Sequence, residues 1–257
     1  MKLIKTIGMM VLLLSLSTFG ITAEQKGLNI AIANDKANTG FKTETNDSTM
    51  VLINAYGDKI ERKMRFKSSE TKNDGDKSII EFLWPADVKG TRMLTYTHKN
   101  RNDDQWLFLP ALNRIKRISS NNQSGSFMGS EFAYEDISSE EIEKYTYKLI
   151  KNDTLNGRAV WVIERIPTNK KSGYSKQISF TDKVYKNPLK IEYYDRKGER
   201  LKTSTFSGFK QYGKYWRQSK IEIINHQTQK SSVLTWSNRK MGIPIPANDF
   251  HKNSLMN

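Results

Sequence analysis

The sequence predicts a mainly β protein built on one large antiparallel sheet or barrel. From Thr49 onward, apolar residues recur with a period of two, which is the period of a strand. About a dozen such segments follow at a spacing of roughly 8–15 residues, separated by turn-forming runs such as NDGD, DRKGE and NHQTQ. No run rich in glycine and serine divides the chain, so we expect a single domain over residues 24–257.

Residues 1–23 have the parts of a secretory signal peptide. Lys2 and Lys5 precede a 15-residue apolar run that ends at Ile21, and Ala23 is the small residue at the predicted cleavage site. An uncleaved anchor is the less favoured alternative, because a membrane-spanning helix needs roughly 20 apolar residues. No cysteine follows the cleavage site, which excludes a lipoprotein. We predict cleavage after Ala23 and export to a bacterial periplasm.

The chain is strongly basic, with 42 Lys and Arg against 27 Asp and Glu and a formal net charge of +15. Loss of Lys2 and Lys5 with the signal peptide lowers this charge by two. Such a surface attracts anionic partners, namely phospholipid headgroups, lipopolysaccharide or nucleic acid. Because an exported chain rarely meets nucleic acid, we expect lipid anions, transient contact with a membrane surface and no nucleic acid. A solvated basic surface without a specific partner is the alternative.

The elements are predicted in order from the N-terminus. Leu28, Ala31 and Ile32 have helical spacing, which indicates a short helix over residues 24–40. The run MVLINAYGDKIERKMRF predicts a hairpin that turns at Gly57 and Asp58. Further strands are predicted at KSIIEFLW, TRMLTYTH, DQWLFL, RIKRI, YTYKLI, AVWVIER, KQISF, PLKIEYY, RLKTSTF, YWRQSKIEII and SSVLTW.

Several of these strands are apolar on both faces. The runs IIEFLW, WLFL and AVWVI lack the alternating polar residues of a strand with one solvated face. Either the protein's own chain covers the second face, or that face lines an apolar cavity. Periodicity does not decide which face points inward. We expect a cavity, and its candidate lining residues are Trp84, Leu94, Tyr96, Trp106, Phe108 and Leu109.

The residue types of common catalytic centres are sparse. The absence of cysteine excludes disulfides, thiolate nucleophiles and thiolate zinc sites. Three histidines are present, no two of them at metal-ligand spacing, and the sequence has no HExxH, GxSxG, P-loop or GxGxxG motif. The adjacent acids Glu135 and Asp136 would point to opposite faces of a strand or, in a turn, into water. We therefore expect no enzyme activity, no metal and no cofactor.

The segment SFMGSEFAYEDI, residues 126–137, combines aromatic residues, acids and glycine. It contains no His, Cys, Lys or Arg that could tune its acids, so we do not expect a catalytic site. Two interpretations remain open. One is a movable apolar gate over a cavity, and the other is a rigid structural clasp. The residues concerned are Phe127, Met128, Gly129, Phe132 and Tyr134.

The run WLFLPALNRIKRISSNNQSGSFMGSEFAYEDI resembles the outer-membrane lipoprotein-sorting protein family, a LolA-like group of secreted proteins. The similar motifs are LPAL, Arg-Ile-Ser, FMGS and the pattern F-x-Y-x-D. The upstream FLWPADVKGTRMLTY is also similar to that family, whereas Glu131 stands where an Asp is expected. The resemblance is clear over residues 49–137 and weaker over the rest.

This resemblance implies an unclosed, strongly curved antiparallel β half-barrel, LolA-like and LppX-like, with helices or loops plugging its concave face. It also implies a carrier of lipid or acyl-chain cargo that works with an RND-type exporter. The basic residues Arg114, Lys116 and Arg117 would then lie near the cavity mouth and meet an anionic headgroup.

The sequence is compatible with three functions. The leading one is a non-enzymatic periplasmic carrier of lipid or lipidated cargo, acting as a monomer. The second is a lipid or glycan hydrolase, against which the missing nucleophile constellation argues. The third is a protein-binding module that docks on an exporter or an outer-membrane partner.

Overall fold

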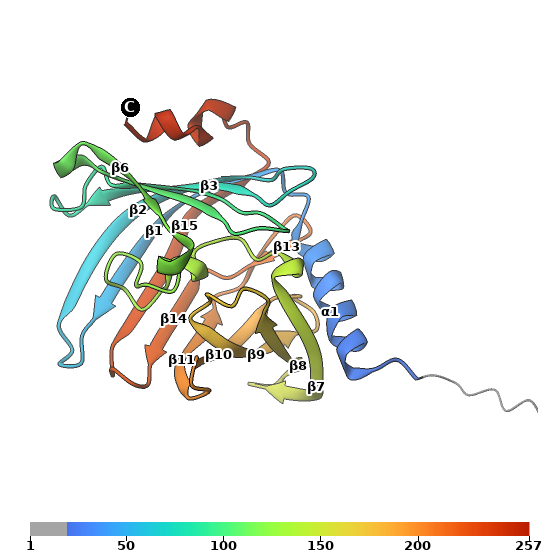
Figure 1. The fold of residues 1–257 in the computed structure, drawn as a ribbon. Helices are drawn as coiled ribbons and strands as arrows, with labels where there is room; N and C mark the ends of the chain where they lie inside the picture. Colours follow the sequence, from blue (N-terminus) through green and yellow to red (C-terminus); the bar gives the residue numbers. More distant parts are fainter. Residues whose placement is uncertain (1–19, 257) are drawn as a thin grey trace, which may run out of the picture.

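A computed structural model describes residues 20–256 of the chain. One antiparallel sheet of 13 strands dominates it. Its strands follow in the order β6 (Arg114–Ile118), β5 (Asp104–Leu109), β4 (Arg92–Tyr96), β3 (Lys77–Trp84), β2 (Lys59–Ser69), β1 (Thr43–Ile53), β15 (Ser231–Met241), β14 (Lys220–Asn225), β11 (Arg200–Ser207), β10 (Pro188–Asp195), β9 (Tyr174–Asp182), β8 (Arg158–Pro167) and β7 (Tyr145–Leu155). The sheet curves strongly, but its edge strands β6 and β7 do not pair with each other (Figure 1). The predicted half-barrel is confirmed.

The predicted hairpin is the pair β1 and β2, and its arms extend further than the apolar pattern indicated. The predicted single strand YWRQSKIEII is wrong, because the chain divides it into β13 (Tyr215–Arg217) and β14. The division falls at Ser219, whose N–H donates to the carbonyl oxygens of Ser207 and Gly208 at 3.1 and 3.2 Å. The sequence also gave no sign of β12 (Lys210–Tyr212), which pairs with β13 in a separate two-stranded sheet.

The predicted N-terminal helix is α1 (Ala23–Asn38), the one α-helix among residues 20–256. Thr22 caps its start, since its hydroxyl accepts the N–H of Gln25 at 3.1 Å. The helix lies beside β7 at the open side of the half-barrel (Figure 1). Gly27 permits this close approach, because a Cβ there would lie 2.7 Å from the backbone nitrogen of Lys148. Most of the predicted signal peptide falls in residues 1–19, outside the described residues.

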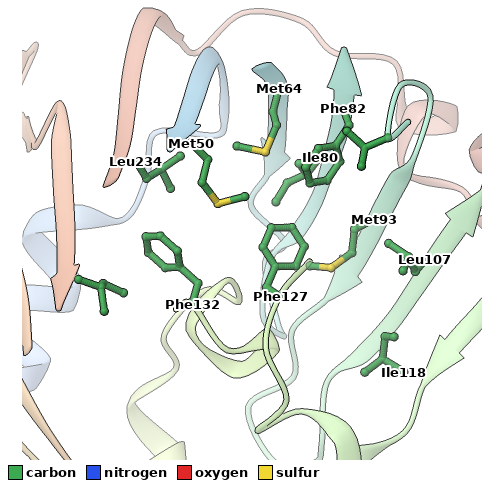
Figure 2. Packing of buried hydrophobic residues seen from close by; sticks show 12 residues of the cluster. Met50, Met64, Ile80, Phe82, Met93, Leu107, Ile118, Phe127, Phe132 and Leu234 are labelled. Carbon is green, nitrogen blue, oxygen red and sulfur yellow. The ribbon is translucent and has the colours of Figure 1, made fainter. Parts of the chain in front are cut away.

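Strands β6 and β7 are consecutive in sequence but lie at opposite edges of the sheet. Residues 119–144, here called the crossing segment, connect them across the concave side (Figure 1). The segment contains three short 3-10 turns, η2 (Ser120–Asn122), η3 (Tyr134–Asp136) and η4 (Ile142–Lys144). Its residues Phe127 and Phe132 pack against inward residues of β1, β2 and β3 in the main hydrophobic core (Figure 2).

Among the strands with two apolar faces, β3 and β5 are covered on their outer side by C-terminal residues of the chain itself. Along β3, Ile80 and Phe82 face the crossing segment, whereas Ile79 faces the other way. That outer face carries two C-terminal 3-10 helices, η5 (Ala247–Phe250) and η6 (Lys252–Met256), which lie across the sheet from the crossing segment (Figure 1). Phe250 and Leu255 pack there against residues of β4 and β5.

Candidate ligand-binding cavity

A cavity of about 490 Å3 lies on the concave side of the sheet, bounded by the crossing segment, α1 and the inner faces of β1, β2 and β15. A second hollow of about 580 Å3 adjoins it and extends toward β10 and β14. Phe132, Asp136 and Arg165 line both. Small-molecule sites usually measure roughly 300–1,000 Å3. The first cavity is therefore large enough to hold a ligand.

One end of the cavity is apolar. Its walls come from neighbouring strands of the sheet and from the crossing segment (Figure 2). The residues that form this end are Met50, Met64, Ile80, Phe127, Phe132 and Leu234. Because these side chains are buried apolar groups, an acyl chain placed among them would lose its apolar contact with water, which is favourable.

The other end is polar, and the name polar end is used here for five of its lining residues, Asn34, Glu44, Asn46, Arg217 and Arg239. The transition runs along β1, whose buried residues are Glu44, Asn46, Ser48 and Met50 in turn. These positions alternate with partly exposed ones, so all four share the inner face. A single strand thus carries the change from charged to apolar lining.

Glu44 holds the polar end together. Its carboxylate oxygens lie 2.9 Å from Arg239 Nε and 3.6 Å from Arg217 Nε, and Asn46 donates to it at 2.9 Å. Arg217 also donates to the carbonyl oxygen of Asn38, the last residue of α1, at 2.9 Å. Burial lowers the pKa of the Arg217 guanidinium, and the Glu44 carboxylate opposes this effect. The two arginines therefore reach the cavity as fixed groups and not as solvated side chains.

Residues 126–137 of the crossing segment contain a tight hairpin-like turn. Ser126 and Ala133 make an isolated β-bridge, and the Phe127 N–H donates to the Phe132 carbonyl oxygen at 2.7 Å. The chain reverses at Met128 and Gly129, whose φ angles of 52° and 80° lie in the left-handed region. Glycine adopts this conformation without steric cost, which explains its place in the motif.

Apolar side chains of this hairpin-like turn enter the core. The Phe127 ring lies 5.9 Å from that of Phe82 and 5.6 Å from that of Tyr134, measured between centroids. Phe127 and Phe132 are buried and line the cavity, whereas Met128 and Tyr134 are partly buried against the same core.

Polar contacts attach this segment to several strands of the sheet. Asp136 accepts hydrogen bonds from Lys202 Nζ at 2.7 Å and from the Tyr174 hydroxyl at 2.8 Å. Lys202 also donates to the Glu131 carbonyl oxygen at 2.8 Å, and the Glu131 carboxylate accepts from Asn225 at 2.7 Å. The acids of the motif are thus engaged by β9, β11 and β14, a pattern that suits a clasp.

Asp76 is a partly buried acid that lines the cavity beside the crossing segment, where its carboxylate accepts a hydrogen bond from the Ser139 hydroxyl at 3.4 Å. Burial, reinforced by Glu141 and Glu70, raises the pKa of Asp76 from 3.8 to about 7. The folded protein thus holds this proton more tightly than the unfolded chain does. The stability that Asp76 contributes is fully present below about pH 4 and is lost as the pH rises through about 7.

We predict that Asp76→Asn reduces the loss of thermal stability between about pH 5 and pH 8, because asparagine does not ionise. The measurement is the melting temperature of both proteins across this range. The difference between them isolates Asp76 from other groups that titrate. If the melting temperature of the variant falls with pH as steeply as that of the unsubstituted protein, Asp76 is not the acid responsible for the loss of stability.

The cavity is lined by residues other than the six predicted from the sequence. Leu94, Tyr96, Trp106 and Phe108 pack against the C-terminal residues on the outer face of the sheet. Trp84 is 49% exposed at the end of β3, and Leu109 packs at the margin of the main core. The physical reason is that the protein's own C-terminal segment covers the second apolar face of these strands.

The predicted headgroup residues Arg114, Lys116 and Arg117 lie on the edge strand β6 with their side chains exposed. Arg117 forms an ion pair with Asp104, and none of the three is among the residues that line the cavity. The structure places other basic residues, Arg217 and Arg239, at the cavity instead.

Sequence reasoning missed the polar end. The signal that could have revealed part of it is the alternation in TETNDSTM, where every second residue is inward. A search for apolar periodicity passes over such a strand, because three of its inward residues are polar. Within residues 20–256, no group of three or more His, Asp or Glu is placed to hold a metal ion. No helix in that range combines the length and apolarity needed to cross a bilayer.

A family model described as "Uncharacterized protein" matches residues 74–257. None of the curated proteins matches the sequence. Among solved structures, an outer membrane lipoprotein-sorting protein domain from Vibrio parahaemolyticus is 49% identical, with a TM-score of 0.89, over 91% of this chain and 100% of that chain.

Two further solved structures are similar. A DUF1329 family protein from Desulfovibrio piger is 26% identical, with a TM-score of 0.87, over 91% of this chain and 99% of that chain. A LolA superfamily protein from Nitrosomonas europaea is 21% identical, with a TM-score of 0.71, over 91% of this chain and 100% of that chain, a likeness of fold alone. Since it is 49% identical to the Vibrio domain over that domain's full length, the chain belongs to the outer-membrane lipoprotein-sorting protein family of LolA-like fold.

Proposed function

We propose that the protein is a non-enzymatic periplasmic carrier that holds a lipid, or the acyl chains of a lipidated cargo, in the concave cavity. The observation that carries this proposal is the cavity of about 490 Å3 with an apolar end formed by the sheet and the crossing segment. The relationship to a lipoprotein-sorting domain supports the same class of function.

The engagement of the motif acids favours a carrier over a hydrolase. Asp136 is held by Lys202 and Tyr174, and Glu135 accepts from the Ser172 hydroxyl and the Gly173 N–H at 2.7 and 2.8 Å. Burial raises the pKa of Glu135. Acids that serve as anchors in this way have no free oxygen directed at a substrate, which is what a general base requires.

Native mass spectrometry of the protein purified from membranes tests the carrier function. We expect co-purified lipid or acyl chains that are lost on denaturation. A preparation that is empty, and that takes up no fluorescent fatty acid or phospholipid, would contradict the proposal.

Filling the cavity is predicted to abolish uptake. Leu234 is buried and lines the cavity, so Leu234→Trp places an indole where we expect the acyl chain. We expect binding of a fluorescent fatty acid to weaken by at least about tenfold, or 1.4 kcal/mol, as measured by titration. The matched control is Thr235→Trp, since Thr235 is the next residue of β15 and is exposed on the opposite face. Equal affinities of the two variants would place the acyl chain elsewhere.

We further propose a monomer that is exported to the periplasm after cleavage at Ala23, contacts the membrane surface transiently and receives or delivers cargo at an RND-type exporter. The motivation is the predicted signal peptide together with the family resemblance. N-terminal sequencing of the periplasmic fraction should begin at Glu24, and a full-length chain retained in the inner membrane would contradict export. Crosslinking in cells, followed by identification of the captured membrane protein, tests the exporter.

A further inference from the structure

We propose that the polar end of the cavity is a headgroup site for an anionic amphiphile whose headgroup carries one negative charge and at least one hydroxyl or amino hydrogen-bond donor. This inference rests on the proposed carrier function and concerns which amphiphile the cavity accepts. It replaces the exposed cluster on β6 as the place where the headgroup is recognised.

The first observation is that the lining of the cavity changes from polar to apolar along β1. On β1 the inward side chains change from Glu44 to Met50 within six residues. The neighbouring strands add apolar residues at the same end, because Ser48 pairs with Met64 of β2 and Met50 pairs with Leu234 of β15. An amphiphile lying along β1 would therefore place its polar group beside Glu44 and its chain beneath the crossing segment.

The charge of the polar end is the second observation. Two guanidinium groups share one carboxylate, and the side chains of Arg217, Arg239 and Glu44 are only 13, 5 and 9% exposed. Glu70, the next carboxylate to influence Arg217, is already engaged by the backbone N–H groups of Gly40 and Lys42 at 2.7 and 2.6 Å. Because an uncompensated buried charge is unfavourable, one ligand anion would complete the site.

Unsatisfied acceptors are the third observation. Within residues 20–256, the side-chain oxygens of Asn34 and Asn46 are buried and accept no hydrogen bond. Asn46 is 3% exposed, and both residues line the cavity. Buried acceptors are nearly always paired, so two of them at one end of a cavity indicate a ligand that donates.

Together these observations distinguish between headgroups. A phosphoglycerol headgroup offers one negative charge and free hydroxyl donors, and so matches both the arginines and the asparagines. A fatty-acid carboxylate offers the charge without donors. A phosphocholine headgroup has no net charge and no donor.

The first test compares three single-chain amphiphiles with the same palmitoyl chain: lysophosphatidylglycerol, palmitate and lysophosphatidylcholine. Calorimetric or fluorescence titration of the delipidated full chain should give the tightest binding for lysophosphatidylglycerol, by about tenfold over the other two. This ratio is the effect of one charge-assisted hydrogen bond. Equal affinities would overturn the headgroup site and leave the carrier function standing, whereas no binding of any of the three would overturn the carrier function itself.

The second test uses Asn34→Ala, which removes an oxygen that has no partner in the protein and so should leave the melting temperature unchanged. We expect this substitution to weaken the binding of lysophosphatidylglycerol about tenfold and to change the binding of palmitate little. The matched control is Asn29→Ala on the same helix, because the Asn29 side chain bonds Gln25 in solvent. An unchanged affinity for lysophosphatidylglycerol in Asn34→Ala would contradict the donor requirement.

The third test uses Arg239→Gln, which removes one guanidinium and leaves Glu44 paired with Arg217. We expect the preference for lysophosphatidylglycerol over lysophosphatidylcholine to disappear, with thermal melting as the check on folding. The comparison variant is Arg114→Gln in the exposed cluster on β6, which should keep that preference. Loss of the preference in Arg114→Gln, with retention in Arg239→Gln, would overturn the proposal. If Arg239→Gln does not fold, Asn34→Ala decides.

Discussion

Lys202→Met is expected to lower the free energy of unfolding by about 3–5 kcal/mol, the usual effect of removing one partner of a buried ion pair. The side chains of Lys202 and Asp136 are 4% and 9% exposed, and their charged atoms lie 2.7 Å apart. The substitution leaves the Asp136 carboxylate buried without its cation and frees the Glu131 carbonyl oxygen as well. Chemical denaturation monitored by tryptophan fluorescence measures the change.

The matched control is Lys220→Met. Lys220 pairs with Glu222 at a similar distance of 2.9 Å, but both side chains are more than two-fifths exposed, at 42% and 41%. An exposed pair contributes only about 0–1 kcal/mol. The double variant Lys202→Met, Asp136→Asn should recover part of the loss, because it removes the buried charge. Similar effects of Lys202→Met and Lys220→Met would mean that the crossing segment is not held by this pair.

Replacing Phe127 and Met128 together by serine is predicted to lower the melting temperature on the order of 10 °C. Emptying a buried aromatic site costs about 3–5 kcal/mol, and each kcal/mol shifts the melting temperature of a domain of this size by about 2–4 °C. Phe127 is 1% exposed and packs between Phe82 and Tyr134, so the loss should come from this residue.

The same variant decides between the two interpretations of the segment. A clasp predicts the lowered melting temperature, whereas a gate predicts an unchanged melting temperature with faster loss of a bound fluorescent fatty acid. Met128→Ser alone is the control, because Met128 is only partly buried and should change stability little. If neither retention nor stability changes in the double variant, residues 126–137 serve neither role.

The period-two patterns were sufficient to predict most of the sheet. The strands at KSIIEFLW, DQWLFL and RIKRI have the bounds expected from the sequence, because turn-forming residues flank both of their ends. Two parts of the sheets were missed because they lack a regular apolar pattern. The first half of β1 has polar residues at its inward positions, and β12 is the short run KQY, so hydrophobic periodicity did not reveal them.

The sequence by itself determined the antiparallel β fold, through its period-two segments, and the family resemblance that implied the half-barrel, through motifs of contiguous residues. The tertiary structure alone decided which face of each strand points inward. Alternation places Leu94 and Met93 on opposite faces, but only the packing of Leu255 shows that the Leu94 face is the outer one.

The polar end likewise could not be predicted from the sequence, because its residues come together only in the folded structure. Arg239 and Glu44 are 195 residues apart in the chain and meet because β15 pairs with β1, while Arg217 reaches them from the end of β13. Each is an ordinary charged residue in the sequence. They become a candidate site because strand pairing and the neighbouring end of α1 remove them from water together, and removal from water changes the energy of a charge.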